Sequence, residues 1–311
     1  MARTIEITAA TEVTDQLQRE VQDLPGLISL RVQRNISLQP PGDVLAVEAT
    51  SNGIMELMRR LDARQLTSSP GVSIRLTQPA GIISSSHVEL IVRDDSEATW
   101  EEMEVALARE TNMTLNGLLI MLLAGFIAAM GINSNGLHLV IGAMVIAPGF
   151  GPLTRMALGM VAGSGGALWR GLVDTARGYA AMILGAAIAG LVLRAAGETS
   201  PGGDSSYFQP ETLIGYWTQP TLQSYLVSAT AAAAGAVLVA AHRTVLTTGV
   251  MIALALVPAA TIIGMSLAWA RFDLAAQGAF RWLIEVALVV VLSALVLLWK
   301  RLRGHKRTMT L

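Results

Sequence analysis

Apolar and polar positions follow two different patterns along this chain, and the change comes near residue 110. In the first part, residues 3–8, 27–38, 44–50 and 72–76 alternate like strands, with a Pro-Pro-Gly turn between the second and third. Residues 12–24 and 52–61 carry apolar side chains at helical spacing. The order β-α-β-β-α-β over residues 1–80 predicts an α+β domain of the ferredoxin-like kind.

Residues 81–113 connect this domain to the rest of the chain. The sequence predicts a strand over Val88–Val92 and an acidic amphipathic helix over Ser96–Glu110. Two interpretations of the helix stay open. It is a solvated connector, since charged runs usually face water, or it is a regulatory helix that packs against something apolar.

The second part of the chain contains six long apolar segments, as expected of membrane-spanning helices of about 20 residues. They define a transmembrane domain over residues 114–300, followed by a basic tail over 301–311. The segments are approximately residues 115–132, 137–162, 172–196, 222–241, 244–270 and 280–299. A soluble protein with a single core is excluded in practice by six such segments in series.

Charged and aromatic residues at the segment ends predict the orientation. Tryptophans gather at these ends, as in the interfacial belts of membrane proteins. Short loops with Arg170, Arg177 and Arg243 and the basic tail fall on one side, whereas residues 133–136 and the acidic loop 198–211 fall on the other. The positive-inside rule therefore predicts a multi-pass protein of the inner or plasma membrane with both termini in the cytoplasm.

Composition narrows the classes of chemistry further. Apolar residues make up 52% of the chain and charged residues 14%, and there is no cysteine. The four histidines are scattered without metal-ligand spacing, and no phosphate-binding Gly-rich loop of the ATPase kind is present. We therefore expect no metal, no cofactor, no nucleic-acid partner and no enzymatic activity.

Two halves of the apolar part resemble each other. Residues 142–148 (GAMVIAP) and 249–258 (GVMIALALVP) both begin Gly-x-Met and reach a proline inside a segment. A shift of 107 residues also superposes the first segment on the fourth and the third on the sixth. Because each half holds three segments, this predicts a 3+3 inverted repeat of the kind found in secondary transporters. Chance similarity between apolar segments is the alternative.

Proline and glycine interrupt the second segment at residues 148–152 (PGFGP) and the fifth at Pro258. Irregular backbone inside a membrane is tolerated where protein buries it or where it lines a watery cavity. We therefore expect a solute path there, with a plain kinked helix as the alternative. The expected path or hinge residues are Gly142, Met144, Pro148, Gly149, Gly151, Pro152, Arg155, Gly249, Met251, Pro258 and Thr261.

Few charges fall inside the apolar segments, and each is a candidate for function. Arg155 either reaches back to the membrane surface or faces the cavity and balances an anion. Asp174 and Glu285 are candidate ion or proton sites, although pairing of Glu285 with Arg281 four residues earlier is a simpler account. The Thr261 hydroxyl either lines the path or bonds to its own helix.

The motif Gly142-Ala143-Met144-x-Ile146-Ala147-Pro148-x-x-Gly151-Pro152, with the later Leu256-Val257-Pro258, resembles a bacterial and archaeal membrane family. This is the uncharacterised hydrophobic-domain family known as domain of unknown function 389. The resemblance covers about residues 115–265. It implies a multi-pass membrane protein and leaves the activity open.

These features together predict a transporter or channel for a small solute or ion, regulated by the cytoplasmic domain. The alternative is a non-transporting membrane sensor or scaffold whose cytoplasmic domain binds a ligand or partner. Small residues crowd the third and fourth segments, which favours close helix packing within the repeat or, less directly, a homo-oligomer. The lipid bilayer is the other expected partner.

Overall fold

The computed structural model describes residues 2–79, 82, 84, 86–92, 94, 98–198, 213–241 and 247–303. They form two compact units, of which the first contains Met1–Glu102 and the second Met103–Arg303. Three features expected from the sequence lie outside the described residues: the basic tail beyond Arg303, nearly all of the acidic loop, and Arg243.

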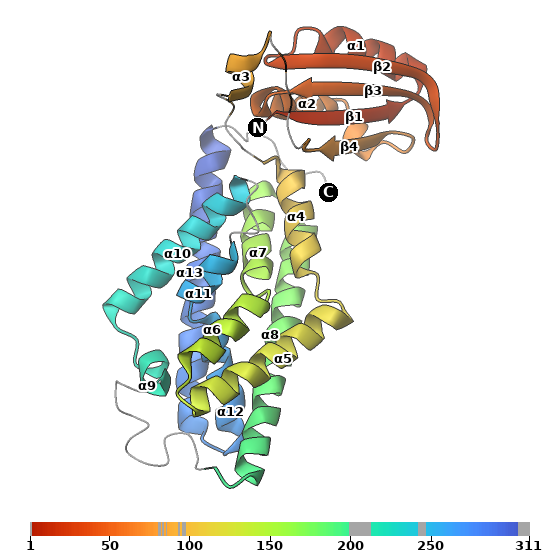
Figure 1. Cartoon of the computed structure of the whole chain (residues 1–311). Helices are drawn as coiled ribbons and strands as arrows, with labels where there is room; N and C mark the ends of the chain where they lie inside the picture. Colours follow the sequence, from red (N-terminus) through yellow and green to blue (C-terminus); the bar gives the residue numbers. More distant parts are fainter. Residues whose placement is uncertain are drawn as a thin grey trace. The chain divides into compact units, whose positions relative to one another are not determined.

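The first unit contains a four-stranded antiparallel sheet. Its strands are β1 (Arg3–Ala9), β2 (Leu27–Leu38), β3 (Pro41–Ala49) and β4 (Ser73–Thr77). They lie side by side in the order β2-β3-β1-β4, and every neighbouring pair is antiparallel (Figure 1). The two strands β1 and β4 that are most distant in sequence therefore pair directly.

Alternation along the strands gives this sheet one apolar face. Ile5 and Ile7 of β1 stand opposite Val47 and Leu45 of β3, and all four side chains are fully buried. The helices α1 (Thr11–Val21) and α2 (Ser51–Ala63) contribute further apolar side chains to the same core. A short 3₁₀ turn, η1 (Leu66–Ser68), follows α2. The pattern of period two along strands and 3.6 along helices thus produces a packed α+β unit.

The strand expected over Val88–Val92 is wrong, because these residues form a short helix, α3. An alternating pattern of four or five residues fits one helical turn as well as a strand, and no neighbouring strand of the sheet pairs with it. The expected acidic helix is present as α4 (Trp100–Thr111).

Long apolar helices make up most of the second unit. Four of them are long and apolar enough to cross a membrane: α5 (Leu115–Asn133), α8 (Gly165–Ala195), α10 (Leu222–Ala240) and α13 (Phe272–Arg303). Two further pairs are bent, α6 (Leu137–Ile146) with α7 (Phe150–Ala162) by 45° and α11 (Thr247–Ala253) with α12 (Leu256–Ala268) by 53°. The described residues thus contain four candidate spans, or six if each bent pair is one span. A further short helix is α9 (Leu213–Thr218).

Two of the helices are longer than the apolar segments predict. Helix α8 begins at Gly165 rather than near residue 172, and α13 begins at Phe272 rather than near 280. A helix rises about 1.5 Å per residue, so about 20 residues suffice for the hydrocarbon core. The extra turns are more polar, and hydropathy alone does not include them. Because these turns extend the beginnings of α8 and α13, the charged residues of both helices lie nearer the helix middle than the apolar segments predict.

Glycines allow α5 and α8 to cross closely. A Cβ atom added at Gly125 of α5 would lie 2.1 Å from the carbonyl oxygen of Met182, and one added at Gly185 of α8 would lie 1.9 Å from that of Leu122. Each glycine therefore faces the backbone of the other helix. The small residues that the sequence shows in α8 serve packing within the chain.

Candidate functional site

The two bent helix pairs are the irregular features of the second unit. Residues 147–149 interrupt α6 and α7, and residues 254–255 interrupt α11 and α12. Pro152 and Pro258 are each the third residue of the helix that follows the break. The first amides of a helix have no intrahelical acceptor, so proline is tolerated there. Pro258 therefore starts a helix, and the expectation that the fifth segment breaks at Pro258 is corrected to Leu254–Ala255.

The break between α6 and α7 is closed by an aromatic side chain. Tyr179, near the middle of α8 and 2% exposed, donates a hydrogen bond of 3.2 Å from its hydroxyl to the carbonyl oxygen of Gly149. A Cβ atom at Gly149 would lie 2.5 Å from that hydroxyl and 3.0 Å from Cε of Met251. A larger residue at Gly149 would therefore displace the Tyr179 hydroxyl or the end of the Met251 side chain, and Met251 of α11 lies beside the first break.

The break between α11 and α12 is closed by a carboxylate. Glu285 of α13 is fully buried, and its Oε2 accepts a hydrogen bond of 3.3 Å from the amide of Ala255. Its Oε1 accepts a bond of 2.8 Å from the Ser228 hydroxyl of α10. The carboxylate thus lies at the start of α12, where a negative charge is favoured by the free amides and by the helix dipole.

Arg281 neutralises this carboxylate. Its Nη2 lies 2.6 Å from Oε1 of Glu285 and donates a 2.7 Å hydrogen bond to the Ser224 hydroxyl. The guanidinium carbon lies 4.6 Å from the centre of the Tyr225 ring, which adds a cation–π contact. The pairing of Glu285 with Arg281 expected from their spacing is confirmed.

The two breaks are closed in the same way. Tyr179 follows its backbone partner Gly149 by 30 residues, and Glu285 follows Ala255 by 30 residues. In each case, a polar side chain of a long helix, Tyr179 of α8 or Glu285 of α13, bonds to the backbone of a bent pair, the tyrosine as donor and the carboxylate as acceptor. Sequence analysis missed Tyr179 and Ser228 as parts of this arrangement. A polar residue 30 positions after each break was the signal that could have found both closures.

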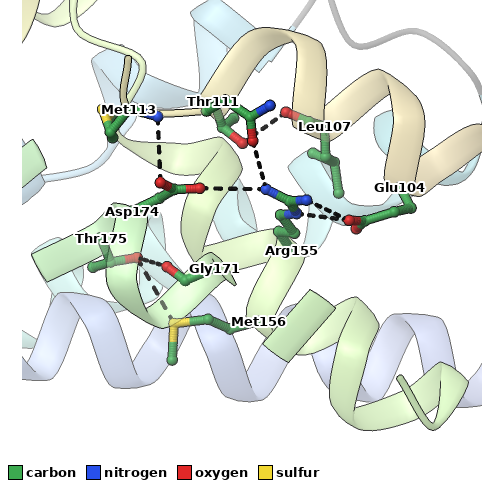
Figure 2. Close-up of polar contacts among 10 residues, drawn as sticks. Glu104, Leu107, Thr111, Met113, Arg155, Met156, Gly171, Asp174 and Thr175 are labelled. Atoms are coloured by element: carbon green, nitrogen blue, oxygen red, sulfur yellow. Dashed lines mark hydrogen bonds and ion pairs between the residues drawn. The ribbon is translucent and has the colours of Figure 1, made fainter. Parts of the chain in front are cut away.

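Arg155 belongs to a separate polar cluster, shown in Figure 2. Its Nε and Nη2 donate to Oε1 of Glu104 at 2.9 and 2.5 Å, and its Nη1 lies 3.3 Å from Oδ2 of Asp174. Nη1 also donates to the Asn112 side-chain oxygen at 2.9 Å. Arg155 is 1% exposed. It therefore neither reaches the surface nor stands free to balance a solute, but is neutralised by the chain itself.

This cluster also decides between the two interpretations of the acidic helix. Glu104 of α4 is 5% exposed, and Leu107 and Met103 on the same helix are buried. The solvated-connector interpretation is wrong for residues 103–111, since they belong to the second unit and Glu104 forms a buried ion pair with Arg155 there. Asp174 also accepts a 3.3 Å hydrogen bond from the amide of Met113, and thus fixes the start of α5.

The remaining expected path residues fall into different surroundings. Gly142 on α6 and Gly249 on α11 have nothing within 4 Å of an added Cβ, so neither is a packing glycine. Gly151 is a packing glycine, since a Cβ atom added there would lie 1.9 Å from Cγ2 of Thr111. Met144 is buried in α6, and the Thr261 hydroxyl donates 2.8 Å to the Val257 carbonyl of its own helix. Asp174 and Glu285 lie in different clusters.

The described residues contain no group of three or more His, Cys, Asp or Glu side chains that could hold a metal ion. The charged groups at the breaks are the Glu285 carboxylate and the Arg281 guanidinium, which form hydrogen bonds with hydroxyls and a backbone amide. Such a set can bind charge and exchange hydrogen bonds with a polar solute.

Comparison with known proteins adds a family to this geometry. The sequence pattern described as Domain of unknown function (DUF389) matches residues 144–291, which begin in α6 and end in α13. Comparisons with curated proteins and with solved structures gave no match. The matched residues include both helix breaks and both closing side chains, whereas Gly142 lies just outside them. Residues 144–291 are therefore similar to the family described as Domain of unknown function (DUF389).

Proposed function

We propose that this protein is an integral membrane transporter or channel for a small solute or ion. The observation that carries the proposal is the buried Arg281–Glu285 pair at a helix break, inside a unit made of apolar helices. Ionisable residues in apolar spans are costly, and they mark ion and solute pathways. Glu285 is the fourteenth residue of α13, about 20 Å along the helix axis from Phe272, which places it in the middle part of the span.

We also propose that the spans form a 3+3 inverted repeat, which would agree with transport. A shift of 107 residues carries the bounds of α5, 115–133, onto those of α10, 222–240. The same shift carries α8, 165–195, to 272–302, against 272–303 for α13. The bent pairs correspond within three residues at each bound. Three spans in each half would insert the halves in opposite senses, as in transporters whose broken helices meet near the midplane.

Packing between the halves follows the same correspondence. Helix α7 of the first half packs against α8 and also against α13, and α12 of the second half packs against α13 and also against α8. The first members of the two bent pairs, α6 and α11, contact each other. Each second half-helix therefore lies between the two long third helices, an arrangement that a two-fold relation between the halves accounts for.

The first unit is proposed to be a ferredoxin-like regulatory domain. Its order β-α-β-β-α-β and antiparallel sheet β2-β3-β1-β4 agree with that fold. Helix α4 follows this domain and is fixed to α7 and α8 through Arg155. A change in the position of α4 would therefore alter a buried ion pair in the membrane unit, which is a physical route for regulation.

Location and orientation complete the proposal. We place the apolar unit in the inner or plasma membrane, with both termini on the cytoplasmic side. The basic residue Arg170, the sixth residue of α8, would then lie on the cytoplasmic side, as the positive-inside rule requires. No enzymatic step is proposed.

Currents across a reconstituted membrane test this function. Purified full-length protein is reconstituted on a solid-supported membrane, and currents are recorded after exchange to Na⁺, K⁺, H⁺, acetate, phosphate or glycine. We expect a current for at least one of them, lost in Gly149→Leu, whose side chain would collide with Tyr179 and Met251. Gly165→Leu at the start of α8 is the matched control, because an added Cβ there has nothing within 4 Å among the described residues.

A folded Gly149→Leu variant with the same current as the wild type would show that the break at Gly149 is not part of the solute path. Absence of current for every probe, with the protein folded and inserted, would favour the second candidate, a membrane sensor or scaffold. The Arg155 cluster is the observation that favours this candidate, because it links α4 to the membrane helices without needing a path.

A further inference from the structure

The Arg281 guanidinium is buried with part of its hydrogen-bonding capacity unused. Its side chain is 2% exposed, yet within the described part of the chain Nε and Nη1 have no hydrogen-bond partner. Only Nη2 is occupied, by Glu285 and by Ser224. A buried N–H group without an acceptor costs free energy, and a charged group costs more than a neutral one. The site therefore has donors available for one more acceptor.

Every neighbour that bonds to Glu285 in this site is a donor. The carboxylate receives hydrogen bonds from the Ser228 hydroxyl and the Ala255 amide, and it forms an ion pair with Arg281. Helix α12, which has 13 residues, begins directly after Ala255. A helix start, a hydroxyl and a guanidinium are the groups that bind carboxylates and phosphates in proteins. Glu285 thus occupies a complete oxyanion site.

Arg281 supplies one positive charge, and the Glu285 carboxylate neutralises it. A second oxyanion at the unused Nε and Nη1 positions would share that charge with an ionised Glu285, and the two would repel each other in an apolar interior. Binding of an external oxyanion therefore requires the Glu285 side chain to leave Arg281 or to lose its charge.

We propose that Arg281, Ser228 and the start of α12 form the binding site for a small oxyanion, and that Glu285 is its built-in competitor. The ligand carries a carboxylate or a phosphate, the groups that a guanidinium fork and helix amides recognise. The inference deepens the proposed function, because it assigns the class of solute that the central site binds.

Ligand binding to the purified full-length chain tests this assignment. Isothermal titration calorimetry in detergent uses sodium acetate and sodium phosphate as probes, with sodium chloride at equal ionic strength as the reference. Glu285→Gln keeps the shape of the side chain and removes the competing charge. We expect its Kd for one of the two probes to be at least about tenfold lower than that of the wild type, which corresponds to about 1.4 kcal/mol. The probe that binds separates a carboxylate site from a phosphate site.

The second variant removes the guanidinium. Glu285→Gln with Arg281→Gln leaves a neutral pair, so no buried charge is stranded, and we expect it to bind neither probe. Arg271→Gln in the Glu285→Gln background is the charge-matched control, since Arg271 pairs with Asp273 at the turn between α12 and α13, away from Glu285. It should keep the gain in affinity. Failure of Glu285→Gln to bind acetate or phosphate, or binding that survives loss of Arg281, overturns the assignment.

These results are independent of the flux measurement. Oxyanion binding at Arg281 without any current would support the assigned site and contradict the proposed transport function. A current carried by Na⁺, K⁺ or H⁺, with no acetate or phosphate binding in any variant, would support transport and contradict the assigned ligand.

Discussion

Buried charged side chains determine how the interior of the second unit packs. Arg155 and Arg281 are both almost fully buried; Arg155 pairs with carboxylates of α4 and α8, and Arg281 pairs with Glu285 of its own helix and bonds to Ser224 of α10. Taking a charge out of water costs several kcal/mol, which only close partners offset. Loss of one partner is therefore more damaging than loss of the pair.

Glu104→Gln tests this for the Arg155 cluster. The substitution leaves Arg155 paired with Asp174 alone and weakens its charged hydrogen bonds to Glu104, a loss of about 1.5–3 kcal/mol. We expect a clearly lower unfolding temperature in detergent, measured by intrinsic fluorescence. Arg177→Gln, on the exposed face of α8, is the control and should leave the temperature within a degree or two. Equal stability of both variants would contradict a structural role for the cluster.

Asp43 gives the first unit a dependence on acid. Hydrogen bonds from the Asn35 amide and from Arg34 lower the pKa of Asp43 to about 2, against 3.8 for the free side chain. Its stabilising effect is therefore fully present above pH 3.8 and is lost as the pH falls through about 2. Amide exchange of the β2–β3 hairpin, corrected with an unstructured peptide, should accelerate over that interval. Asp43→Asn should exchange faster at neutral pH and show no such step.

Helices approach one another most closely where glycine permits it. At the α5–α8 crossing, an added Cβ at either Gly125 or Gly185 would overlap a backbone carbonyl, which no side-chain rotation relieves. Gly142 and Gly249 lie in helices of the same unit and face open space. Glycine therefore has different meanings at these positions, although all four stand in apolar segments.

Gly185→Ala should separate α5 from α8 and destabilise the unit by about 1–3 kcal/mol, the usual cost of overpacking. Gly142→Ala should be neutral or slightly stabilising, since alanine is the better helix former by about 1 kcal/mol. Unfolding in a denaturing detergent, followed by far-UV circular dichroism, measures both. A Gly185→Ala protein as stable as Gly142→Ala would mean that the close crossing does not exist in the membrane.

At the scale of the whole molecule, the proposed inverted repeat fixes which loops share a side. The turn after α5, at Ser134, and the turn before α13, at Ala270, should face outwards, and the first turn of α8, at Gly166, should face the cytoplasm. All three positions are exposed in the structure. Because the chain contains no cysteine, single cysteines report their side without background.

In intact cells, a membrane-impermeant maleimide should label Ser134→Cys and Ala270→Cys, whereas Gly166→Cys should react only after the membrane is opened. The order follows from three spans in each half. Labelling of Ser134→Cys and Gly166→Cys from the same side would show that the α6–α7 pair does not cross the membrane, and the repeat would then be excluded.

The sequence by itself determined the elements of this protein. Periods of two and 3.6 residues predicted the sheet strands and helices of the first unit, and long apolar runs predicted the candidate spans, because both signals are local. It also indicated the Pro-Gly interruption near Pro148 and the i, i+4 pair of Arg281 and Glu285. The family pattern over residues 144–291 agrees with the motif around Pro148.

Only the tertiary structure decided which groups meet. Nothing local in the sequence joins Glu104 to Arg155, Tyr179 to Gly149, or Ser228 to Glu285, since 30 to 57 residues separate the partners. It also moved the second break from Pro258 to Leu254–Ala255 and changed Val88–Val92 from strand to helix. Local preference predicts whether a helix forms, whereas its breaks and buried charges depend on partners that packing brings from elsewhere in the chain.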